Sequence, residues 1–258
     1  MPEIPTMLEM LQAGVHFGHK ASKWHPKMKP FIFGERSDVH IINLEKTAKK
    51  LQEALDFVKK TTAAGGVVLF VGSKEQAKEI VKRYAKDAGM PYVTTRWLGG
   101  TFTNFKTIKS VTDRFTDLKS KTATGGLAKY TKKEQLNFQK EIVKLEELVG
   151  GIETLNKLPE AIFVVDVRAE KTAVAEARKK KVPVVALCDT NINPDDVDYP
   201  VPSNDDAVKA IEIMVGLFAA AVKEGKAEYE SKKLVAPVPA PASTPEKPTA
   251  PAVVEEKK

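Results

Sequence analysis

Three short, largely apolar runs predict the buried centre of this chain. They span residues 67–71, 161–165 and 182–188. Runs of this length without polar alternation are typical of strands buried on both faces, as in parallel sheets. Residues 92–95 and 40–43 have the composition of two further short strands.

Between these runs, apolar positions recur at intervals of three and four, which predicts amphipathic helices. The helical patterns cover residues 44–58, 77–88, 173–177 and 211–222. Ser73 and Gln76 have the spacing of a capping box ahead of the second helix. Alternating strands and helices predict an α/β fold, an open parallel sheet with helices on both faces. We assign residues 41–105 and 151–230 to this domain.

Residues 106–150 interrupt the alternation with two helical patterns joined at a glycine pair, Gly125 and Gly126. Thr131 and Glu134 have the spacing of a capping box for the second helix. Two amphipathic helices joined by a short turn predict an inserted antiparallel hairpin of the coiled-coil type. Its outward faces are rich in lysine.

The termini and one long loop lack such patterns. Residues 1–40 are predicted to be irregular, with one short helix that ends at Gly14, and they contain all four histidines of the chain. Residues 189–203 are predicted to form a polar loop with three prolines. Residues 235–258 are rich in proline and alanine, which predicts a disordered tail.

The positive charge of the chain is concentrated in two segments. The net charge is +7 and the isoelectric point is about 9.2. Residues 16–36 carry five basic side chains against one acidic, and residues 106–147 carry ten against six. A basic surplus of this kind favours a polyanionic partner.

The composition also bears on the compartment. No apolar stretch approaches the roughly 20 residues of a membrane helix, and no apolar signal segment follows Met1, so we expect a cytoplasmic protein without membrane contact. The single cysteine, Cys188, excludes an intrachain disulfide and lies in an apolar run. We expect its side chain to belong to the core.

Residues 96–105 (RWLGGTFTNF) combine one arginine, three aromatic rings and a glycine pair. A planar cation beside aromatic faces suits the phosphates and bases of nucleic acid. The alternative is a hinge that buries its rings between two parts of the chain, since buried aromatic side chains are common. The pattern alone leaves both interpretations open.

Four side chains form a candidate metal site: His19, Asp189, Asp205 and Asp206. Asp189 follows a strand, and Asp205 and Asp206 precede a helix, so all three are expected at one edge of the sheet. If His19 folds over that edge, the mixed nitrogen and oxygen set suits zinc or magnesium. The alternative is that Asp205 caps the helix and Asp189 forms a turn.

The sequence offers no assembled catalytic site. The turn at residues 72–74 (GSK) lacks the spacing of a phosphate-binding loop, and no serine or cysteine lies in a nucleophile elbow. One alternative function is a doubly wound enzyme in which Asp189 and Asp205 hold magnesium. Another is a basic scaffold whose hairpin binds a second protein.

Several separated motifs, in order, resemble the bacterial family of small-subunit ribosomal protein S-two. They are GVHFGH at 14–19, WHPKM at 24–28, FIFGER at 31–36, HIINL at 40–44, RWLGG at 96–100, TNF at 103–105, DTN at 189–191 and PSNDD at 202–206. The resemblance covers about residues 5–225. It departs at Asn43, where the family usually has aspartate, and at residues 37–39, where Ser-Asp-Val replaces Asn-Gly-Ile.

The resemblance implies a flavodoxin-like doubly wound parallel sheet with a protruding coiled-coil hairpin. It implies a structural protein, not an enzyme, that needs no cofactor and binds small-subunit rRNA between the head and body of the subunit. The expected partners are neighbouring small-subunit proteins and ribosomal protein S-one, which captures messenger RNA for translation. We expect a ribosome-associated protein that does not act as a free homo-oligomer.

With this resemblance, three surfaces are predicted to contact rRNA. The first comprises Lys20, Lys23, Trp24, Lys27, Lys29 and Arg36; the second Arg96, Trp97, Thr103 and Asn104; the third Lys106, Lys109, Lys132 and Lys133. The cations are expected to meet phosphates. Trp97 is expected either to stack on a base or to brace its own loop.

Overall fold

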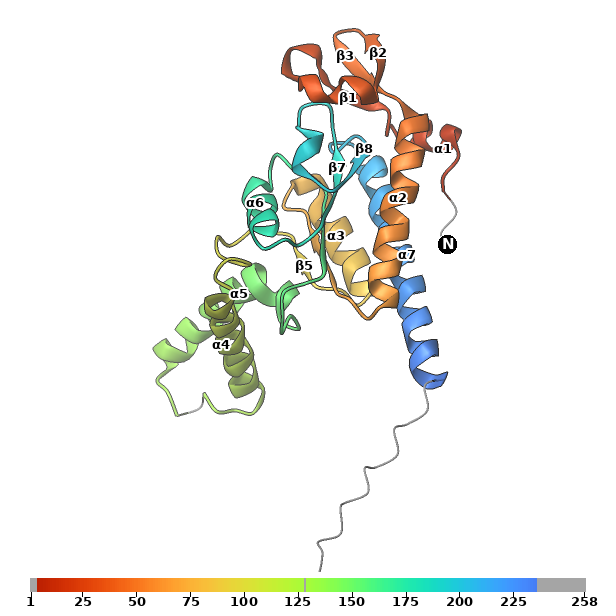
Figure 1. Ribbon diagram of the computed structural model, residues 1–258. Coiled ribbons are helices and arrows are strands. Elements are labelled where there is room, and N and C mark those ends of the chain that lie inside the picture. The colour runs from red at the N-terminus through yellow and green to blue at the C-terminus, as the bar shows by residue number, and fades with distance from the viewer. Residues whose placement is uncertain (1–3, 128, 236–258) are drawn as a thin grey trace, which may run out of the picture.

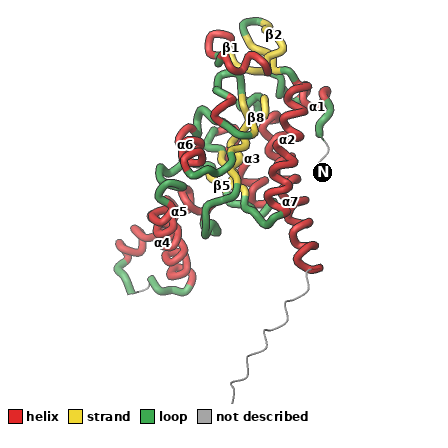
Figure 2. Tube along the Cα trace, viewed as in Figure 1, coloured by secondary structure: helices red, strands yellow, loops and turns green. Residues whose placement is uncertain are grey.

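A five-stranded parallel sheet forms the centre of the protein (Figures 1 and 2), whose computed structural model describes residues 4–127 and 129–235. The strands are β4 (Val68–Val71), β5 (Tyr92–Val93), β6 (Ala161–Val164), β7 (Val184–Cys188) and β8 (Tyr199–Pro202). Their order is β5-β4-β6-β7-β8, which is the doubly wound, flavodoxin-like arrangement. The predicted α/β fold is confirmed.

Helices cover both faces of this sheet. The helices α2 (Leu44–Ala63), α3 (Glu75–Asp87) and α7 (Val208–Val235) lie on one face, and α6 (Lys171–Lys179) lies on the other (Figure 1). Alternate strand residues point to opposite faces, so Phe70 and Phe163 belong to the first core and Leu69 and Ile162 to the second. The continuous apolar runs of the sequence supply both cores at once.

A smaller antiparallel sheet lies at the N-terminal end, above the carboxyl ends of the parallel strands (Figure 1). After α1 (Met7–Gln12), it contains β1 (Phe17–Lys20), β2 (Ile32–Arg36) and β3 (Val39–Ile42) in the order β1-β3-β2. The 3-10 helices η1 (Ala21–Lys23) and η2 (Pro26–Phe31) connect β1 to β2. The prediction of an irregular segment over residues 1–40 therefore missed β1 and β2.

The turn between β2 and β3 explains part of this error. Ser37 and Asp38 both have positive φ, 51° and 59°, as a two-residue hairpin turn of the I′ type requires. The usual sequence signal for that turn is Asn-Gly or Asp-Gly. Ser-Asp does not provide it, although the backbone adopts the same conformation here.

The insertion forms two helices, α4 (Phe105–Ala123) and α5 (Lys132–Val149). The 3-10 helix η3 (Gly150–Ile152) directly follows α5. The predicted capping box is present: the Glu134 N–H donates to Thr131 Oγ1 at 3.4 Å, and the Thr131 N–H donates to Glu134 Oε2 at 2.9 Å. Arg114 on α4 pairs with Glu141 on α5 at 2.7 Å. The hairpin is confirmed as a helical pair, and its coiled-coil packing stays a prediction.

Two local predictions of the sequence are wrong. No capping box precedes α3, because Lys74 is its N-cap residue without a side-chain hydrogen bond. The predicted polar loop at residues 189–203 contains the 3-10 helix η4 (Pro194–Asp196) and the strand β8. The strand tolerates Pro200 and Pro202 because β8 is the last strand of the sheet and pairs with β7 alone.

The described part of the chain has no helix that is both long and apolar enough to cross a membrane. The predicted disordered tail lies, from residue 236 onward, outside the described residues.

The close contact of α2 with α7 depends on Gly225. A Cβ at this position would lie 1.9 Å from Thr62 Oγ1 and 2.6 Å from the Lys59 carbonyl oxygen. Because such overpacking forces helices apart, we expect Gly225→Ala to lower the free energy of unfolding by about 1–3 kcal/mol. Chemical denaturation would measure the change.

Gly216 on the same helix is the matched control. A Cβ there would lie 3.4 Å from the Tyr84 ring, close to an ordinary contact. Gly216→Ala is expected to leave stability unchanged or raise it by up to about 1 kcal/mol, the difference in helix propensity. Equal losses in both variants would contradict the role given to Gly225.

Candidate nucleic-acid interface

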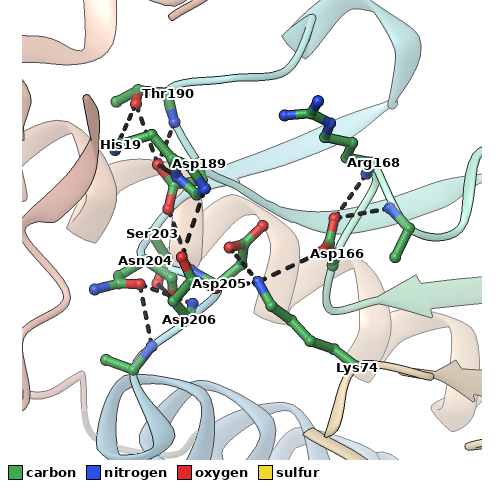
Figure 3. A network of polar contacts seen from close by, with 12 residues as sticks. His19, Lys74, Asp166, Arg168, Asp189, Thr190, Ser203, Asn204, Asp205 and Asp206 are labelled. Carbon is green, nitrogen blue, oxygen red and sulfur yellow. Dashed lines mark hydrogen bonds and ion pairs between the residues drawn. The ribbon is translucent and has the colours of Figure 1, made fainter. Parts of the chain in front are cut away.

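A cluster of charged side chains lies where the parallel strands end (Figure 3). Lys74 follows β4, and its Nζ lies 2.5 Å from Asp206 Oδ1, 2.9 Å from Asp205 Oδ1 and 3.5 Å from Asp166 Oδ2. Asp166 follows β6, whereas Asp205 and Asp206 follow β8. Lys74 thus joins carboxylates that follow β6, the neighbour of β4, and the edge strand β8, at the edge where α/β folds usually bind ligands.

His19 connects the small sheet to this cluster. Its Nδ1 lies 3.1 Å from Asp189 Oδ1 and its Nε2 lies 3.5 Å from Asp206 Oδ2. The hydrogen bond to Asp189 raises the pKa of His19, which outweighs the opposing effect of burial. The His19 backbone N–H donates to Thr190 Oγ1 at 2.9 Å. These contacts fix the N-terminal sheet over the strand ends.

The cluster brings three of the four predicted metal ligands together. Side-chain ligand atoms of His19, Asp205 and Asp206 lie within 4.8 Å of one another. Lys74 already pairs with both carboxylates, and the fourth predicted ligand, Asp189, bonds to His19. A divalent cation would therefore have to displace the Lys74 ammonium. Lys74 and His19 offset only part of the charge of the four carboxylates Asp166, Asp189, Asp205 and Asp206.

The alternative role of Asp205 as a helix cap is wrong. The backbone N–H groups of Asp206 and Ala207 donate to Asn204 Oδ1 at 2.8 and 3.1 Å, which forms a turn ahead of α7 that is built on Asn204. Asp205 is 1% exposed and faces Lys74 instead. Burial and the charges of Asp166 and Asp189 raise the pKa of Asp205 to about 7, although Lys74 opposes them.

Glu176 on α6 holds the aromatic and glycine-containing segment at residues 96–105. The backbone N–H groups of Gly100, Phe102 and Thr103 donate to its carboxylate at 2.6, 2.9 and 3.0 Å. The Thr103 hydroxyl donates at 3.1 Å and Trp97 Nε1 at 3.4 Å. Burial alone raises the pKa of Glu176, but the three backbone donors together outweigh it and lower the pKa.

This segment is mainly a brace. Trp97 is 7% exposed and packs edge-on against Phe102, with ring centroids 5.0 Å apart. Its indole packs inside its own loop and presents no exposed face to a base. The expected alternative that Trp97 stacks on a base is therefore wrong. The Thr103 hydroxyl is likewise engaged by Glu176. Arg96 and Asn104 are exposed, so these two of the four predicted side chains are open to a partner.

The N-terminal surface keeps most of its predicted cations. Exposed side chains here are Lys20, Lys23, Lys27, Lys29 and Arg36. Lys27 pairs with Asp195 at 2.5 Å, which partly neutralises it. Trp24 is half-buried with its ring 5.2 Å from that of His40, so it supports the fold of the segment.

On the hairpin surface, one predicted cation has an internal partner and three are exposed. Lys109 pairs with Asp113 at 3.2 Å and donates to Asn156 Oδ1 at 2.7 Å. Lys106, Lys132 and Lys133 are exposed. The open lysines lie near the two ends of the hairpin.

All three surfaces are anchored in the same core. Met28 from the N-terminal segment, Trp97 and Phe102 from the glycine-containing segment, and Phe115 from the hairpin belong to the second core, together with α6. Figure 1 shows α6 and the hairpin on the side of the sheet away from α2 and α7. Each of the three cationic surfaces therefore has a side chain anchored in the second core, and the N-terminal segment also reaches the first core through Met10, Ala13 and Val15.

Sequence patterns missed the two residues that organise the site. The sequence places Lys74 in a turn that only superficially resembles a phosphate loop, whereas its ammonium pairs with three carboxylates in the structure. Glu176 had one usable signal, because it lies on the same buried helix face as Ala173 and Ala177. A charged residue on an apolar face indicates a partner elsewhere in the fold.

The comparison with known families gives one result. A sequence model of the family described as ribosomal protein S2, the S-two family above, matches residues 10–225, most of the chain. That family consists of structural proteins of the small ribosomal subunit and not of enzymes. Membership of this family implies that the chain is associated with the ribosome, in a context of rRNA and neighbouring proteins. The chain therefore belongs to the ribosomal protein S2 family and is a structural constituent of the small ribosomal subunit.

Proposed function

We propose that this chain binds small-subunit rRNA through the layer that carries α6, the hairpin and the N-terminal segment. The observation that carries the proposal is the common anchoring of three cationic surfaces in the second core. Phosphate contacts dominate the affinity of proteins for nucleic acid, and a rigid layer of cations suits them. As the family resemblance implies, the site is the junction between the head and body of a bacterial subunit.

The cations differ in how much they can contribute. Lys20, Lys29 and Arg36 are exposed, and no ion pair to another described residue competes for them. Lys27 and Lys109 must exchange an internal partner for a phosphate. We therefore assign the larger share of RNA affinity to the unpaired cations.

The proposal includes protein partners. Recruitment of ribosomal protein S-one and a cytoplasmic location rest on the family resemblance. The chain offers one surface of suitable character on α1, where Met7, Leu8 and Leu11 are 50%, 64% and 52% exposed. Clustered exposed apolar side chains of this kind are typical of protein contacts.

A bound zinc or magnesium ion at His19, Asp189, Asp205 and Asp206 stays a prediction. Lys74 supplies part of the positive charge that the acidic side chains require. The ion pairs of Lys74 and His19 support a cluster that serves to hold the N-terminal sheet in place and that keeps a negative surplus. The rRNA-binding proposal does not depend on an ion.

Replacing Lys29 and Arg36 with alanine is expected to weaken binding to small-subunit rRNA and to flatten its salt dependence. Each lost phosphate contact lowers the slope of log K against log salt by about 0.7–0.9. Filter binding across a range of KCl concentrations would measure the slope.

Lys49→Ala together with Lys60→Ala is the matched control, because both lysines are exposed on α2, on the opposite layer. We expect this pair to leave the slope unchanged. Equal slopes for the two double variants would exclude the N-terminal surface from the interface.

A further inference from the structure

A pocket of about 650 Å³ lies beside α6, at the carboxyl ends of β6 and β7. Three segments form its walls: the 3-10 turns after β1, the loop and helix after β6, and the loop after β7. The side chains that matter for its chemistry are Lys23, Val167, Arg168, Lys171, Val174 and Ile192. A pocket of this size accommodates a small organic ligand.

The rim of the pocket is strongly cationic. Arg178 pairs with Asp196 at 2.8 Å, which closes one side and consumes the only carboxylate among the lining residues. Lys23, Arg168 and Lys171 remain, each exposed and without an ion pair to a described residue. Figure 3 shows the Arg168 guanidinium extending away from the Asp166 carboxylate. Three unpaired cations around one cavity favour an anionic group.

The start of α6 adds to this preference. Glu170, the residue before the helix, accepts from the Ser73 N–H at 3.0 Å and does not cap the first turn. The Asp166 carboxylate is also engaged, since it accepts from the N–H groups of Arg168 and Ala169 at 2.8 and 3.0 Å. The first-turn amides of α6 therefore have no side-chain acceptor within residues 4–127 and 129–235, as suits a phosphate.

The interior of the pocket has a different character. Val167, Val174 and Ile192 are 6%, 4% and 5% exposed and supply an apolar wall. Asn191 also lines the pocket, and its side-chain oxygen is buried without a hydrogen-bond partner among the described residues, so a ligand in the pocket reaches this oxygen only when the side chain rotates. A buried acceptor without a partner is costly, so it favours a ligand that carries an N–H donor.

We infer that this pocket binds a nucleotide, with its phosphate on Lys23, Arg168 and Lys171 and its base against the apolar wall. A nucleobase has flat faces for Val174 and Ile192, and its amino or imino groups can donate to Asn191 Oδ1 once that side chain rotates toward the cavity. Two sources share this chemistry: an unpaired nucleotide of an RNA chain and a free mononucleotide. The first would deepen the proposed rRNA-binding function on which it rests.

The test uses the full chain and amide chemical shifts of residues 167–175 and 191–193. Adenosine monophosphate and a short single-stranded oligoribonucleotide are expected to bind saturably and to shift these amides. Adenosine and inorganic phosphate alone are expected to bind at least about tenfold more weakly, since each supplies half of the contacts. No saturable shift with either nucleotide probe would overturn the proposal.

Two variants locate the binding. Arg168→Ala is expected to raise the dissociation constant of adenosine monophosphate about tenfold, because a guanidinium contact to phosphate is lost. Ala175→Trp fills the cavity from an exposed helix position and is expected to abolish binding. Lys60→Ala on α2 is the matched control and is expected to change nothing. Full binding by Ala175→Trp with native circular dichroism would place the ligand elsewhere and overturn the proposal.

Binding to small-subunit rRNA separates the two sources. Weaker rRNA binding by both pocket variants would support an RNA nucleotide as the occupant. Unchanged rRNA binding with lost mononucleotide binding would support a free nucleotide. A wild-type chain that binds adenosine monophosphate but not rRNA would contradict the proposed rRNA-binding function and would still support nucleotide binding in the pocket.

Discussion

Glu176→Gln is expected to lower the free energy of unfolding by about 2–4 kcal/mol, because one buried carboxylate satisfies three backbone N–H groups at once. Gly100, Phe102 and Thr103 donate to it at 2.6–3.0 Å. Glutamine keeps one acceptor oxygen, but its amino group faces backbone donors and its charge is lost. Chemical denaturation would measure the loss, and faster amide exchange at the three donors would locate it.

The pH dependence gives an independent check on Glu176. The folded protein holds the pKa of Glu176 below its ordinary value of 4.5. The ionised carboxylate therefore stabilises the fold above pH 4.5, and this contribution fades as the pH falls through the lowered pKa. We expect the difference in stability between wild type and Glu176→Gln to narrow on acidification below that value.

Glu79→Gln on α3 is the matched control, because Glu79 is exposed. Its effect on stability is expected to stay within about 0.5 kcal/mol. If Glu176→Gln were equally harmless, the loop would be held by its apolar contacts alone, and the bracing role of Glu176 would be wrong.

Lys74→Met is expected to cost about 3–5 kcal/mol, the penalty for leaving buried charge without its partner. Asp205 is 1% exposed and Asp166 is 8% exposed, and both face the Lys74 ammonium. Methionine preserves the apolar stem of the side chain and removes the charge. Denaturation at several pH values would follow the loss.

The penalty of Lys74→Met is expected to shrink at acidic pH. With Lys74 present, the pKa of Asp205 is about 7, above its ordinary value of 3.8. Without the ammonium, which lowers it, this pKa rises further. Below about pH 7 Asp205 is protonated in the folded state of both proteins, so its part of the penalty is smallest there. The penalty grows as the pH rises from about 7 through the higher pKa of the variant, because only the variant still binds the extra proton in that window. A penalty that grows on acidification would contradict the role of Lys74.

Lys78→Met serves as the control for Lys74→Met. Lys78 lies one helical turn after Lys74. Among the described residues its single ion-pair partner is the exposed Glu75, at 2.7 Å. A surface pair of this kind is worth at most about 1 kcal/mol. We expect no pH-dependent penalty in this variant.

The elements that the sequence predicted well are those whose signal is local. Strands β4, β6 and β7 are buried on both faces, so each appears as an uninterrupted apolar run. The hairpin was found from helical periodicity and from the capping box at Thr131. Strands β1 and β2 belong to the small antiparallel sheet and β8 lies at the edge of the large one, so none of them has a continuous apolar run. Pro200 and Pro202 also obscure β8.

The sequence predicts which cations of the candidate interface are exposed, but it does not predict which side chains contact one another there. Exposed cations such as Lys29 and Arg36 are visible in composition, because solvated side chains need no tertiary partner. The roles of Trp97 and Lys74 depend on residues far along the chain: Trp97 bonds to Glu176 and Lys74 to Asp205. Such contacts exist only once the strands are ordered in the sheet, so no local pattern could distinguish a brace from a stacking surface.

The central claim is that the layer carrying α6 and the hairpin faces rRNA. Acetylation of lysines in the full chain, free and co-sedimented with small ribosomal subunits, tests it most directly. We expect Lys20, Lys29, Lys106 and Lys132 to be protected in the subunit, whereas Lys49 and Lys60 on α2 keep their reactivity. Protection confined to the α2 layer, or failure of the chain to co-sediment with the subunit, would contradict the account.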